Sequence, residues 1–302
     1  MEAGLHELPL VIFTVLGQGV AGAFIALSFL LLTQKEVYIQ RKAHYAMTVL
    51  WVLMAIAFIA STTHLGSPER AFNALNRVGQ SGLSNEIATG SLFFATGVAY
   101  WLFGIARWLP ETWQKNGIIR LLNKISGFLT ALWQPILLIV VSLLGIGFVY
   151  TMSSLYAIPT VPTWNTVYTP IAFGLTALLV GFTLTICLCQ YADIKKEQKG
   201  YLALLWLAFI IAIISNYRYY HYLQNVSSAV VNALDLVPEL ASISIIRLVL
   251  LLVGLLLTTL AYRKHTPFLA LIGVCCVFIA ECLMRILFYG SHMTVGMKAL
   301  GL

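Results

Sequence analysis

Long apolar runs alternate with short polar connections along the whole sequence. Each run is near or above the roughly 20 residues that a helix needs to cross about 30 Å of hydrocarbon. Because the bilayer core holds no water to satisfy backbone groups, runs of this length are expected to be helical. The pattern predicts an all-α fold: a bundle of eight transmembrane helices in a single transmembrane domain over residues 1–302. The helices are expected near residues 8–33, 43–63, 87–106, 127–150, 168–190, 201–217, 240–261 and 266–289.

The composition supports a polytopic membrane protein. Of the 302 residues, 60% are hydrophobic and only 10% are charged, a balance that soluble domains do not show. The net charge of +7 is therefore interpreted as a topology signal, and no nucleic-acid partner is expected. The five cysteines lie in apolar runs without Cys-x-x-Cys spacing, so we expect no metal ion or iron-sulfur cluster in this protein.

The basic residues are distributed unequally between the two sides of the predicted bundle. Cytoplasmic connections of membrane proteins are rich in Lys and Arg. Both termini are therefore expected in the periplasm, for a multi-pass protein of the bacterial inner (cytoplasmic) membrane. The cytoplasmic set is Lys35, Arg41, Lys42, Arg107, Lys115, Arg120, Lys124, Lys195, Lys196, Lys199, Arg263 and Lys264. The periplasmic set is Arg70, Arg77, Arg218 and Lys298.

The polar stretch after the second run is expected to form a short helix on the membrane surface. A Gly-Ser-Pro sequence at 66–68 suits the end of one helix and the start of another. Ser84 or Asn85 can cap the third transmembrane helix, which would leave Glu86 in its first turn. His64 and Glu86 would then flank a lid-like segment at the outer boundary.

His64 and Glu86 suit a polar aromatic ligand that enters from lipid. A quinol headgroup needs hydrogen-bond partners at its two oxygens and acceptors for two protons, and a His with a Glu supplies both. The alternative is structural, because helix ends routinely collect such residues as caps and as snorkelling side chains. From the residues alone, the structural alternative is favoured.

Three further charged residues lie inside predicted helices. Glu281 and Arg285 are four residues apart, so they share a helix face and are expected to form an ion pair within the bundle. Arg247 lies early in the seventh predicted helix. It could snorkel outward, meet Asp235 or Glu239, or bind a lipid or quinone oxygen, and the structural roles are favoured.

The histidine spacing argues against haem. His44 and His64 share one predicted helix and are separated by about 30 Å of helical rise, so they cannot ligate the same haem. No histidine lies in the middle of a predicted span. The aromatic residues near the outer boundary are instead expected to form an interfacial belt. They are Trp164, Tyr168, Tyr217, Tyr219, Tyr220 and Tyr222.

Four segments carry a family resemblance. They are "HELPLVIFTVLGQGVAGAF" at 6–24, "HLGSPERAFNALNRVGQSGLSNEIATGSLFF" at 64–94, "TVPTWNTVYTP" at 160–170 and "FYGSHMTVGM" at 288–297. In these segments the sequence resembles the membrane anchor subunit of bacterial dimethyl sulfoxide reductase. The family's eight spans and outward termini agree with the hydropathy pattern.

The resemblance implies a quinol-oxidising subunit without haem, metal or iron-sulfur cluster of its own. In that family, a catalytic subunit holds molybdenum on molybdopterin, and a ferredoxin-like subunit holds four [4Fe-4S] clusters. The anchor completes a heterotrimer, binds menaquinol and passes its electrons to those clusters in anaerobic respiration. The family's quinol-site histidine and glutamate fall on His64 and Glu86, which reverses the preference for a structural role.

Two other functions remain as alternatives at this stage. A small-solute transporter would show broken helices and polar groups near the midplane, whereas here the polar groups gather at one boundary. A passive membrane dock would use its polar residues only to shape loops. The anchor of a related sulfur-oxyanion or selenate reductase would resemble this protein as well, because the terminal acceptor is reduced on another subunit.

Overall fold

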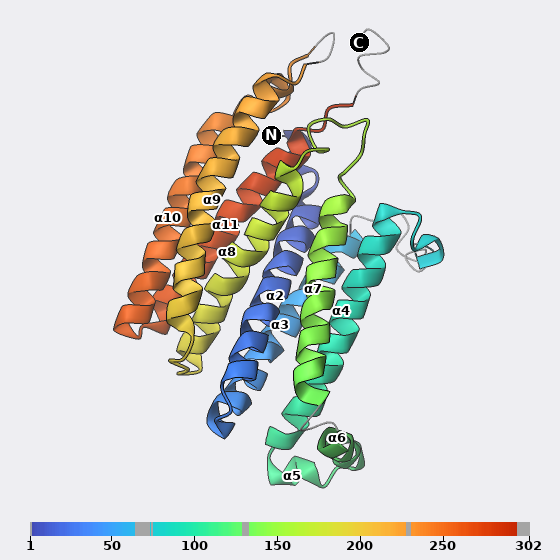
Figure 1. Ribbon diagram of the computed structural model, residues 1–302, viewed down its shortest axis with the longest axis vertical. Coiled ribbons are helices and arrows are strands. Elements are labelled where there is room, and N and C mark those ends of the chain that lie inside the picture. Colours follow the sequence, from blue (N-terminus) through green and yellow to red (C-terminus); the bar gives the residue numbers. More distant parts are fainter. Residues whose placement is uncertain (1, 64–72, 74, 129–132, 228–230, 295–302) are drawn as a thin grey trace.

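The computed structural model describes residues 2–63, 73, 75–128, 133–227 and 231–294. Within these residues, eight helices are long and apolar enough to cross a membrane (Figure 1), which confirms the predicted number. They are α2 (Leu8–Thr33), α3 (Val37–Thr63), α4 (Gly82–Ile105), α7 (Trp133–Ser154), α8 (Tyr168–Tyr191), α9 (Gln198–Gln224), α10 (Leu240–Lys264) and α11 (Pro267–Gly290). The shorter helices are α1 (Glu2–Leu5), η2 (Ala106–Trp108), α5 (Glu111–Gln114), α6 (Gly117–Phe128) and η3 (Ala233–Leu236).

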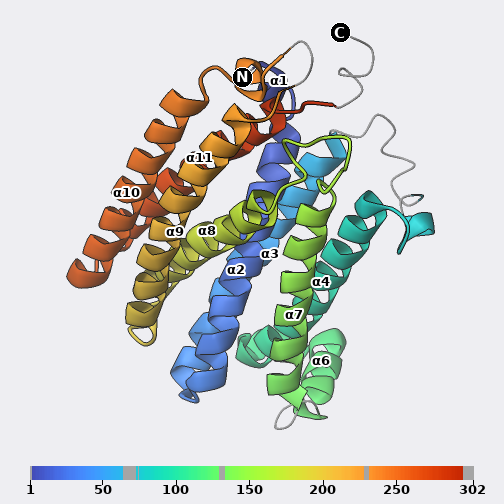
Figure 2. The ribbon, with the colours of Figure 1, turned by 45° about the horizontal axis from the view of Figure 1, so that its top comes forward.

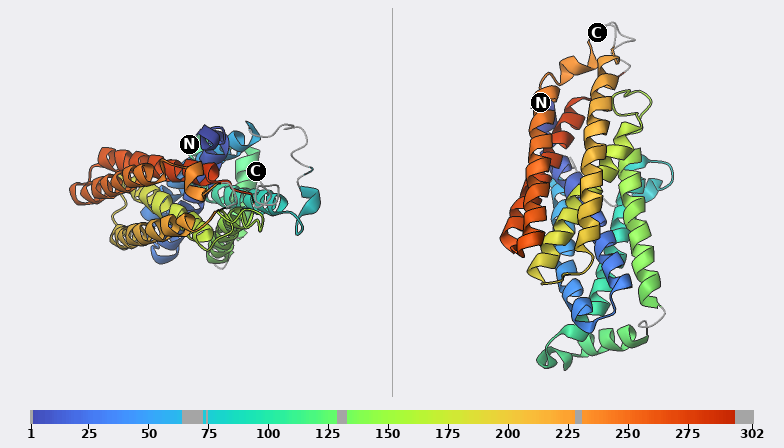
Figure 3. Two further views of the ribbon diagram at one scale, coloured as in Figure 1. Left: turned by 90° about the horizontal axis from the view of Figure 1, so that it is seen from above. Right: turned by 60° about the vertical axis from the view of Figure 1, so that its left-hand side comes forward.

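Helices α2 and α8 form the centre of the bundle. In their most apolar stretches, 78% and 72% of the residues are buried, against 22–39% in the other six spans. Helices α3, α4 and α7 lie on one side of this pair and α9, α10 and α11 on the other, so that the bundle is elongated when seen from above (Figure 3). The two central helices therefore connect both halves.

Small residues bring the central helices into close contact. A Cβ atom on Gly22 of α2 would lie 1.9 Å from the carbonyl oxygen of Ala177 in α8, and one on Gly181 would lie 2.6 Å from the backbone of α2. No larger side chain fits at either position without moving a backbone. Because lipid is as apolar as the helices, close packing of this kind is a main source of association between membrane helices.

The observed helix ends differ from the predicted ones where polar or aromatic residues continue a helix. Helix α3 begins at Val37 rather than near 43, and α9 continues through its tyrosine-rich end to Gln224 rather than stopping near 217. The connection after α4 contains α5 and α6, and α7 begins at Trp133 rather than near 127. Hydropathy marks the hydrocarbon core, whereas backbone hydrogen bonding carries a helix beyond it.

The two ends of the bundle carry different segments. One end holds the N-terminus, the connection 155–167 and η3, and the opposite end holds α5 and α6 (Figures 1 and 2). The connections that carry the predicted cytoplasmic set of basic residues lie at the end that holds α5 and α6.

Candidate functional site

A cavity of about 860 Å³ lies at the end of the bundle where α2 and α4 begin and α3 ends. Its walls are mainly apolar and include Leu10 and Phe13 from α2, Phe58 from α3 and Ile87 from α4. The connection 155–167 and the end of α11 complete them. A volume of this size, with apolar walls and few polar groups, is typical of sites for small organic ligands.

Glu86 is the buried carboxylate in this wall. Helix α4 begins at Gly82, and the side chain of its N-cap Ser81 accepts a hydrogen bond from the backbone N–H of Ser84 at 3.5 Å. Glu86 therefore lies in the second turn, not the first, and the predicted caps Ser84 and Asn85 lie inside the helix. The residue is only 2% exposed, and no described residue bonds its Oε1 atom.

An unpartnered buried carboxylate oxygen is costly to a folded protein. Buried polar groups are nearly always hydrogen-bonded, and a charged group left without a partner carries the full penalty of its lost hydration. At Glu86 this oxygen belongs to a residue that lines the cavity of about 860 Å³. A ligand hydroxyl in that cavity would supply the missing donor.

Aromatic residues complete the cavity wall. Trp164 donates from its indole Nε1 to the carbonyl of Phe288 at 2.7 Å and stacks on the Phe288 ring, with 5.3 Å between centroids. The ring of His292 lies 4.6 Å from that of Trp164. The connection 155–167 is thereby fixed to the end of α11.

The hydroxyls of Tyr156 and Tyr289 form a hydrogen bond beside this aromatic group. Their oxygens are 2.9 Å apart, and Tyr289 donates to Thr14 Oγ1 at 3.5 Å. Tyr156 then donates to Tyr289, since each phenol has one proton, and its own oxygen remains able to accept. Burial raises the pKa of Tyr156 well above its ordinary value, so the phenol stays protonated at neutral pH.

His64 lies outside the described residues, as do Gly66, Ser67, Pro68 and Arg70 of the predicted surface helix. The structure describes 73 and 75–81 of that connection, with 3₁₀ geometry at 75–77 and a turn at 78–80. In the turn, Gly79 has a φ of +86° and donates its N–H to Asn85 at 2.6 Å. Leu75 of this connection also lines the cavity, so the connection contributes to its wall.

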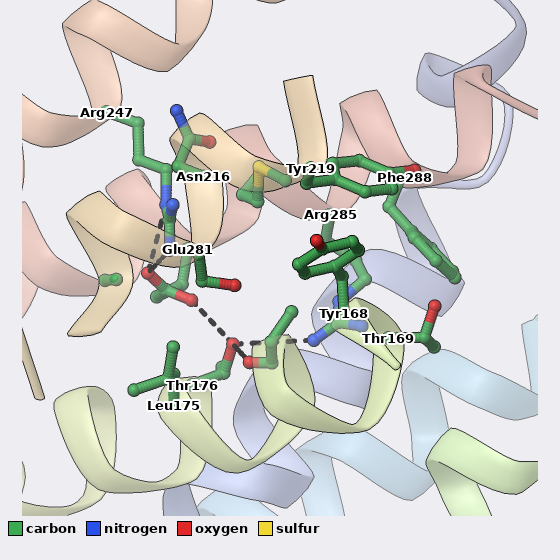
Figure 4. Close-up of a pocket in the computed structure, with 14 residues that line it drawn as sticks. Tyr168, Thr169, Leu175, Thr176, Asn216, Tyr219, Arg247, Glu281, Arg285 and Phe288 are labelled. Carbon is green, nitrogen blue, oxygen red and sulfur yellow. Dashed lines mark hydrogen bonds and ion pairs between the residues drawn. The ribbon is translucent and has the colours of Figure 1, made fainter. Parts of the chain in front are cut away.

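A second group of buried polar side chains links residues of five helices, and Figure 4 shows its members Arg247, Glu281, Arg285 and Thr176. Arg247 of α10 and Glu281 of α11 form an ion pair at 2.9 Å, and Thr176 of α8 donates to the other oxygen of Glu281. Arg285 donates to Gln18 of α2 at 2.8 Å and to Thr176 at 3.5 Å. The amide of Gln18 in turn donates to the sulfur of Met152 in α7 at 2.9 Å.

The predicted ion pair between Glu281 and Arg285 is therefore wrong. Both carboxylate oxygens of Glu281 are taken by neighbouring helices, through Arg247 and Thr176. The guanidinium of Arg285 lies over the ring of Phe173, 3.6 Å from its centroid. Arg247 is 3% exposed and paired, so it neither snorkels outward nor meets Asp235, which instead closes a capping box with Asn232.

The predicted aromatic belt is wrong for Tyr219, which lies inside the protein. Tyr219 is buried and donates to the carbonyl of Thr163 at 3.1 Å, and Tyr222 donates to the carbonyl of Pro162 at 2.9 Å. These tyrosines hold the connection 155–167 against α9. Tyr217 is 63% exposed and fits the belt.

Sequence reasoning missed Tyr156, Tyr289, Trp164 and His292 as parts of the cavity. The last three lie within the segments at 160–170 and 288–297 that carry the family resemblance, which is the signal that pointed to them. Among the described residues, no group of three or more His, Cys, Asp and Glu side chains is placed to hold a metal ion.

Comparison with known proteins identifies the family. The family model described as the DMSO reductase anchor subunit (DmsC) matches residues 1–291. The protein belongs to this family. It is similar to an anaerobic dimethyl sulfoxide reductase chain of Haemophilus influenzae, with 40% identity over 299 residues, 98% of the present sequence and 99% of that protein.

Two Escherichia coli proteins are equally similar over almost their whole length. One is an anaerobic dimethyl sulfoxide reductase chain that is 41% identical over 303 residues, covering 98% of the present sequence and 99% of that protein. The other, the anaerobic dimethyl sulfoxide reductase chain YnfH, is 40% identical over 308 residues and is matched over its whole length. The DmsC family and the eight apolar helices together identify a multi-pass membrane anchor of an oxidoreductase complex.

Proposed function

We propose that this anchor subunit oxidises menaquinol in the cavity beside Glu86. The observation that carries the proposal is the buried Oε1 of Glu86, which has no partner among the described residues and belongs to a side chain lining the cavity of about 860 Å³. A quinol hydroxyl supplies the donor that this oxygen lacks. The apolar and aromatic walls suit the ring and the isoprenoid tail of the quinol.

In the proposed reaction, the protons and the electrons of menaquinol leave by separate routes. Menaquinol loses two electrons and two protons when it becomes menaquinone. Glu86 accepts one proton from the hydroxyl that it binds, as a general base within hydrogen-bond reach. We assign the second headgroup contact to His64, following the family resemblance, and the second proton leaves through this contact.

The electrons are passed to an iron-sulfur partner. The family resemblance supports a ferredoxin-like subunit with [4Fe-4S] clusters, and a molybdopterin subunit that reduces the terminal acceptor, in a heterotrimer with this anchor. Dimethyl sulfoxide is the proposed acceptor, because it is named in the three relatives. Menaquinol is the substrate of this subunit, and no haem is required in it.

The partner docks on the end of the bundle that carries the Glu86 cavity. Electrons tunnel efficiently only over short distances, and a cluster at the opposite end would be separated by about 30 Å of hydrocarbon. The docking surface is the connections 64–86, 151–168 and 216–239. This end is the periplasmic one, with both termini, because the basic connections lie at the other end.

Replacing Glu86 with Gln in the assembled complex tests the proposal. The substitution keeps the shape of the side chain and removes the proton acceptor. Menaquinol-linked turnover should fall by about a hundredfold or more, in the range expected for loss of a general base. Reduction by an artificial donor that reaches the partner subunits directly should be retained.

Glu111→Gln is the matched control, since Glu111 is exposed in α5 at the opposite end of the bundle, outside both the cavity wall and the proposed docking surface. It changes the charge equally and should leave menaquinol-linked turnover unchanged. Normal menaquinol-linked turnover in the Glu86→Gln complex would refute the assignment. A parallel loss of both activities would show that Glu86 serves assembly instead.

A further inference from the structure

A second cavity lies at the opposite end of the helices that surround the Glu86 cavity. Its volume is about 340 Å³, and it is formed where α2 ends, α3 begins, α4 ends and α7 begins. Lys35, His44, Arg107 and Trp108 line it together with Gln40 and Gln134. No carboxylate occurs among the described residues of this lining. An anion entering this cavity therefore meets basic groups and no acidic side chain.

The amide side chains of the cavity are occupied with one another and with helix ends. Gln40 donates to the carbonyls of Leu31 and Gln34 at 3.0 and 2.6 Å, and its oxygen accepts from Gln134 at 3.2 Å. The Nδ1 of His44 donates to the carbonyl of Gln40 at 2.7 Å, because a carbonyl can only accept. These bonds fix the walls of the cavity.

Three donors in the lining have no acceptor among the described residues. Arg107 uses its Nε and Nη2 on Ser126, and its Nη1 has no bond to the described part of the protein. The buried Nε1 of Trp108 has no acceptor there, although α3 fixes that residue through a bond from Tyr45 to its carbonyl at 2.9 Å. Lys35 makes no ion pair with any described residue. Phosphate oxygens are strong acceptors for the charged N–H donors of Arg and Lys.

Apolar residues complete the lining and distinguish a lipid from a free anion. Leu31, Leu32, Val37 and Leu138 face the same cavity, and a free inorganic anion would gain nothing from them. A phospholipid joins a charged phosphodiester to a glycerol and acyl chains, so it matches both kinds of wall. The volume suits a headgroup rather than a complete lipid.

The adjacent helix α6 places this end of the bundle at a membrane surface. It lies across the direction of the spanning helices (Figure 3, right), and its residues Ile118 and Leu121 are 71% and 57% exposed. Arg120 and Lys124 lie on the same short helix. Exposed apolar residues combined with basic ones are typical of helices that rest in the headgroup region of anionic membranes.

We propose that this basic cavity binds the phosphodiester headgroup of an anionic phospholipid such as phosphatidylglycerol. Lys35, Arg107 and the indole N–H of Trp108 bind the phosphate, and the leucines contact the glycerol and the first acyl carbons. The site is formed by this subunit alone and does not depend on the quinol chemistry proposed above.

Calorimetric titration with short-chain phosphatidylglycerol tests this site. The full-length protein is purified in detergent, with the subunits that accompany it, and delipidated. The Lys35→Gln/Arg107→Gln variant should bind phosphatidylglycerol about thirtyfold more weakly, given the contribution of each basic residue near an anionic lipid surface. Lys35→Gln alone should weaken binding about fivefold, and this exposed residue has no internal bond to lose.

The matched control is Lys196→Gln/Lys264→Gln, which removes two exposed charges from the same end outside the cavity. It should keep the affinity of the wild type. An equal loss in this control, or unchanged binding in the Lys35→Gln variants, would overturn the proposal. Equally tight binding of zwitterionic phosphatidylcholine, or displacement of the lipid by inorganic phosphate at the same concentration, would overturn it as well.

Discussion

Two glutamates of this bundle are buried to nearly the same degree but differ in the hydrogen bonds that their carboxylates accept. Glu86 is 2% exposed and Glu281 is 1% exposed. Both oxygens of Glu281 accept hydrogen bonds, from Arg247 and Thr176. The Oε1 of Glu86 has no partner among the residues that the structure describes, and its side chain lines a large cavity.

The difference supports a structural role for Glu281 and the ligand-binding role proposed for Glu86. Arg247 and Thr176 bond both carboxylate oxygens of Glu281, and these bonds join α11 to α10 and α8. Glu86 is at the end of the bundle, and its Oε1 has no donor among the described residues. The two glutamates cannot be distinguished by burial alone. They differ in how many of their carboxylate oxygens accept a hydrogen bond.

The largest expected difference is in stability, when each glutamate is changed to glutamine. Glu281→Gln leaves the buried Arg247 without its counter-ion, and loss of one partner of a buried pair costs about 3 to 5 kcal/mol. Glu86→Gln removes no observed bond and should change the free energy of unfolding by less than about 1 kcal/mol. Denaturant unfolding of the two variants in detergent measures the contrast.

The double variant Arg247→Met/Glu281→Met is the control for this contrast. Replacing both partners by apolar residues removes the uncompensated charge, so the variant should recover most of the stability lost in Glu281→Gln. Equal stability losses in Glu86→Gln and Glu281→Gln would contradict the division into a ligand site and a structural pair.

A smaller effect is expected at Tyr156, which shares the cavity with Glu86. Tyr156→Phe removes one hydrogen-bonding hydroxyl and should lower menaquinol-linked turnover about three- to tenfold. Because its raised pKa keeps the phenol protonated, the variant and the wild type should have parallel pH profiles between about pH 6 and 9. A profile that changes shape would show that Tyr156 itself titrates during turnover.

Cysteine labelling at exposed positions, which should perturb the protein least, tests on which side of the membrane Glu86 lies. Cysteines at Thr160 and Lys196, both exposed at opposite ends, are introduced with Cys275 changed to Ser. An impermeant thiol reagent in the periplasm should label Thr160→Cys in the subunit expressed alone and spare Lys196→Cys. Partner subunits should protect Thr160→Cys. The reverse labelling would place the Glu86 cavity on the cytoplasmic side.

Hydropathy was sufficient to predict the eight spans, because the cost of an unsatisfied backbone in lipid acts on each segment separately. The range predicted for α2, 8–33, matches the observed helix at both ends. The start of α3 and the end of α9 could not be predicted from hydropathy. Polar and aromatic residues beyond the hydrocarbon core are compatible with either a continued helix or a loop. The short helix α6 was missed because its apolar residues lead into the next span.

A role for Glu86 was predicted from its position and from the family resemblance, whereas the absence of a partner for its Oε1 among the described residues became visible only in the folded protein. The partner of Glu281 was decided by the tertiary structure, which brings α10 and α8 to that residue in place of Arg285 four positions along the same helix. The contributions of Tyr156, Trp164 and Tyr289 to one cavity also depend on contacts between distant segments. Local spacing and hydropathy report what lies within one helix and at what depth, but the bonds a side chain makes depend on which helices pack against it.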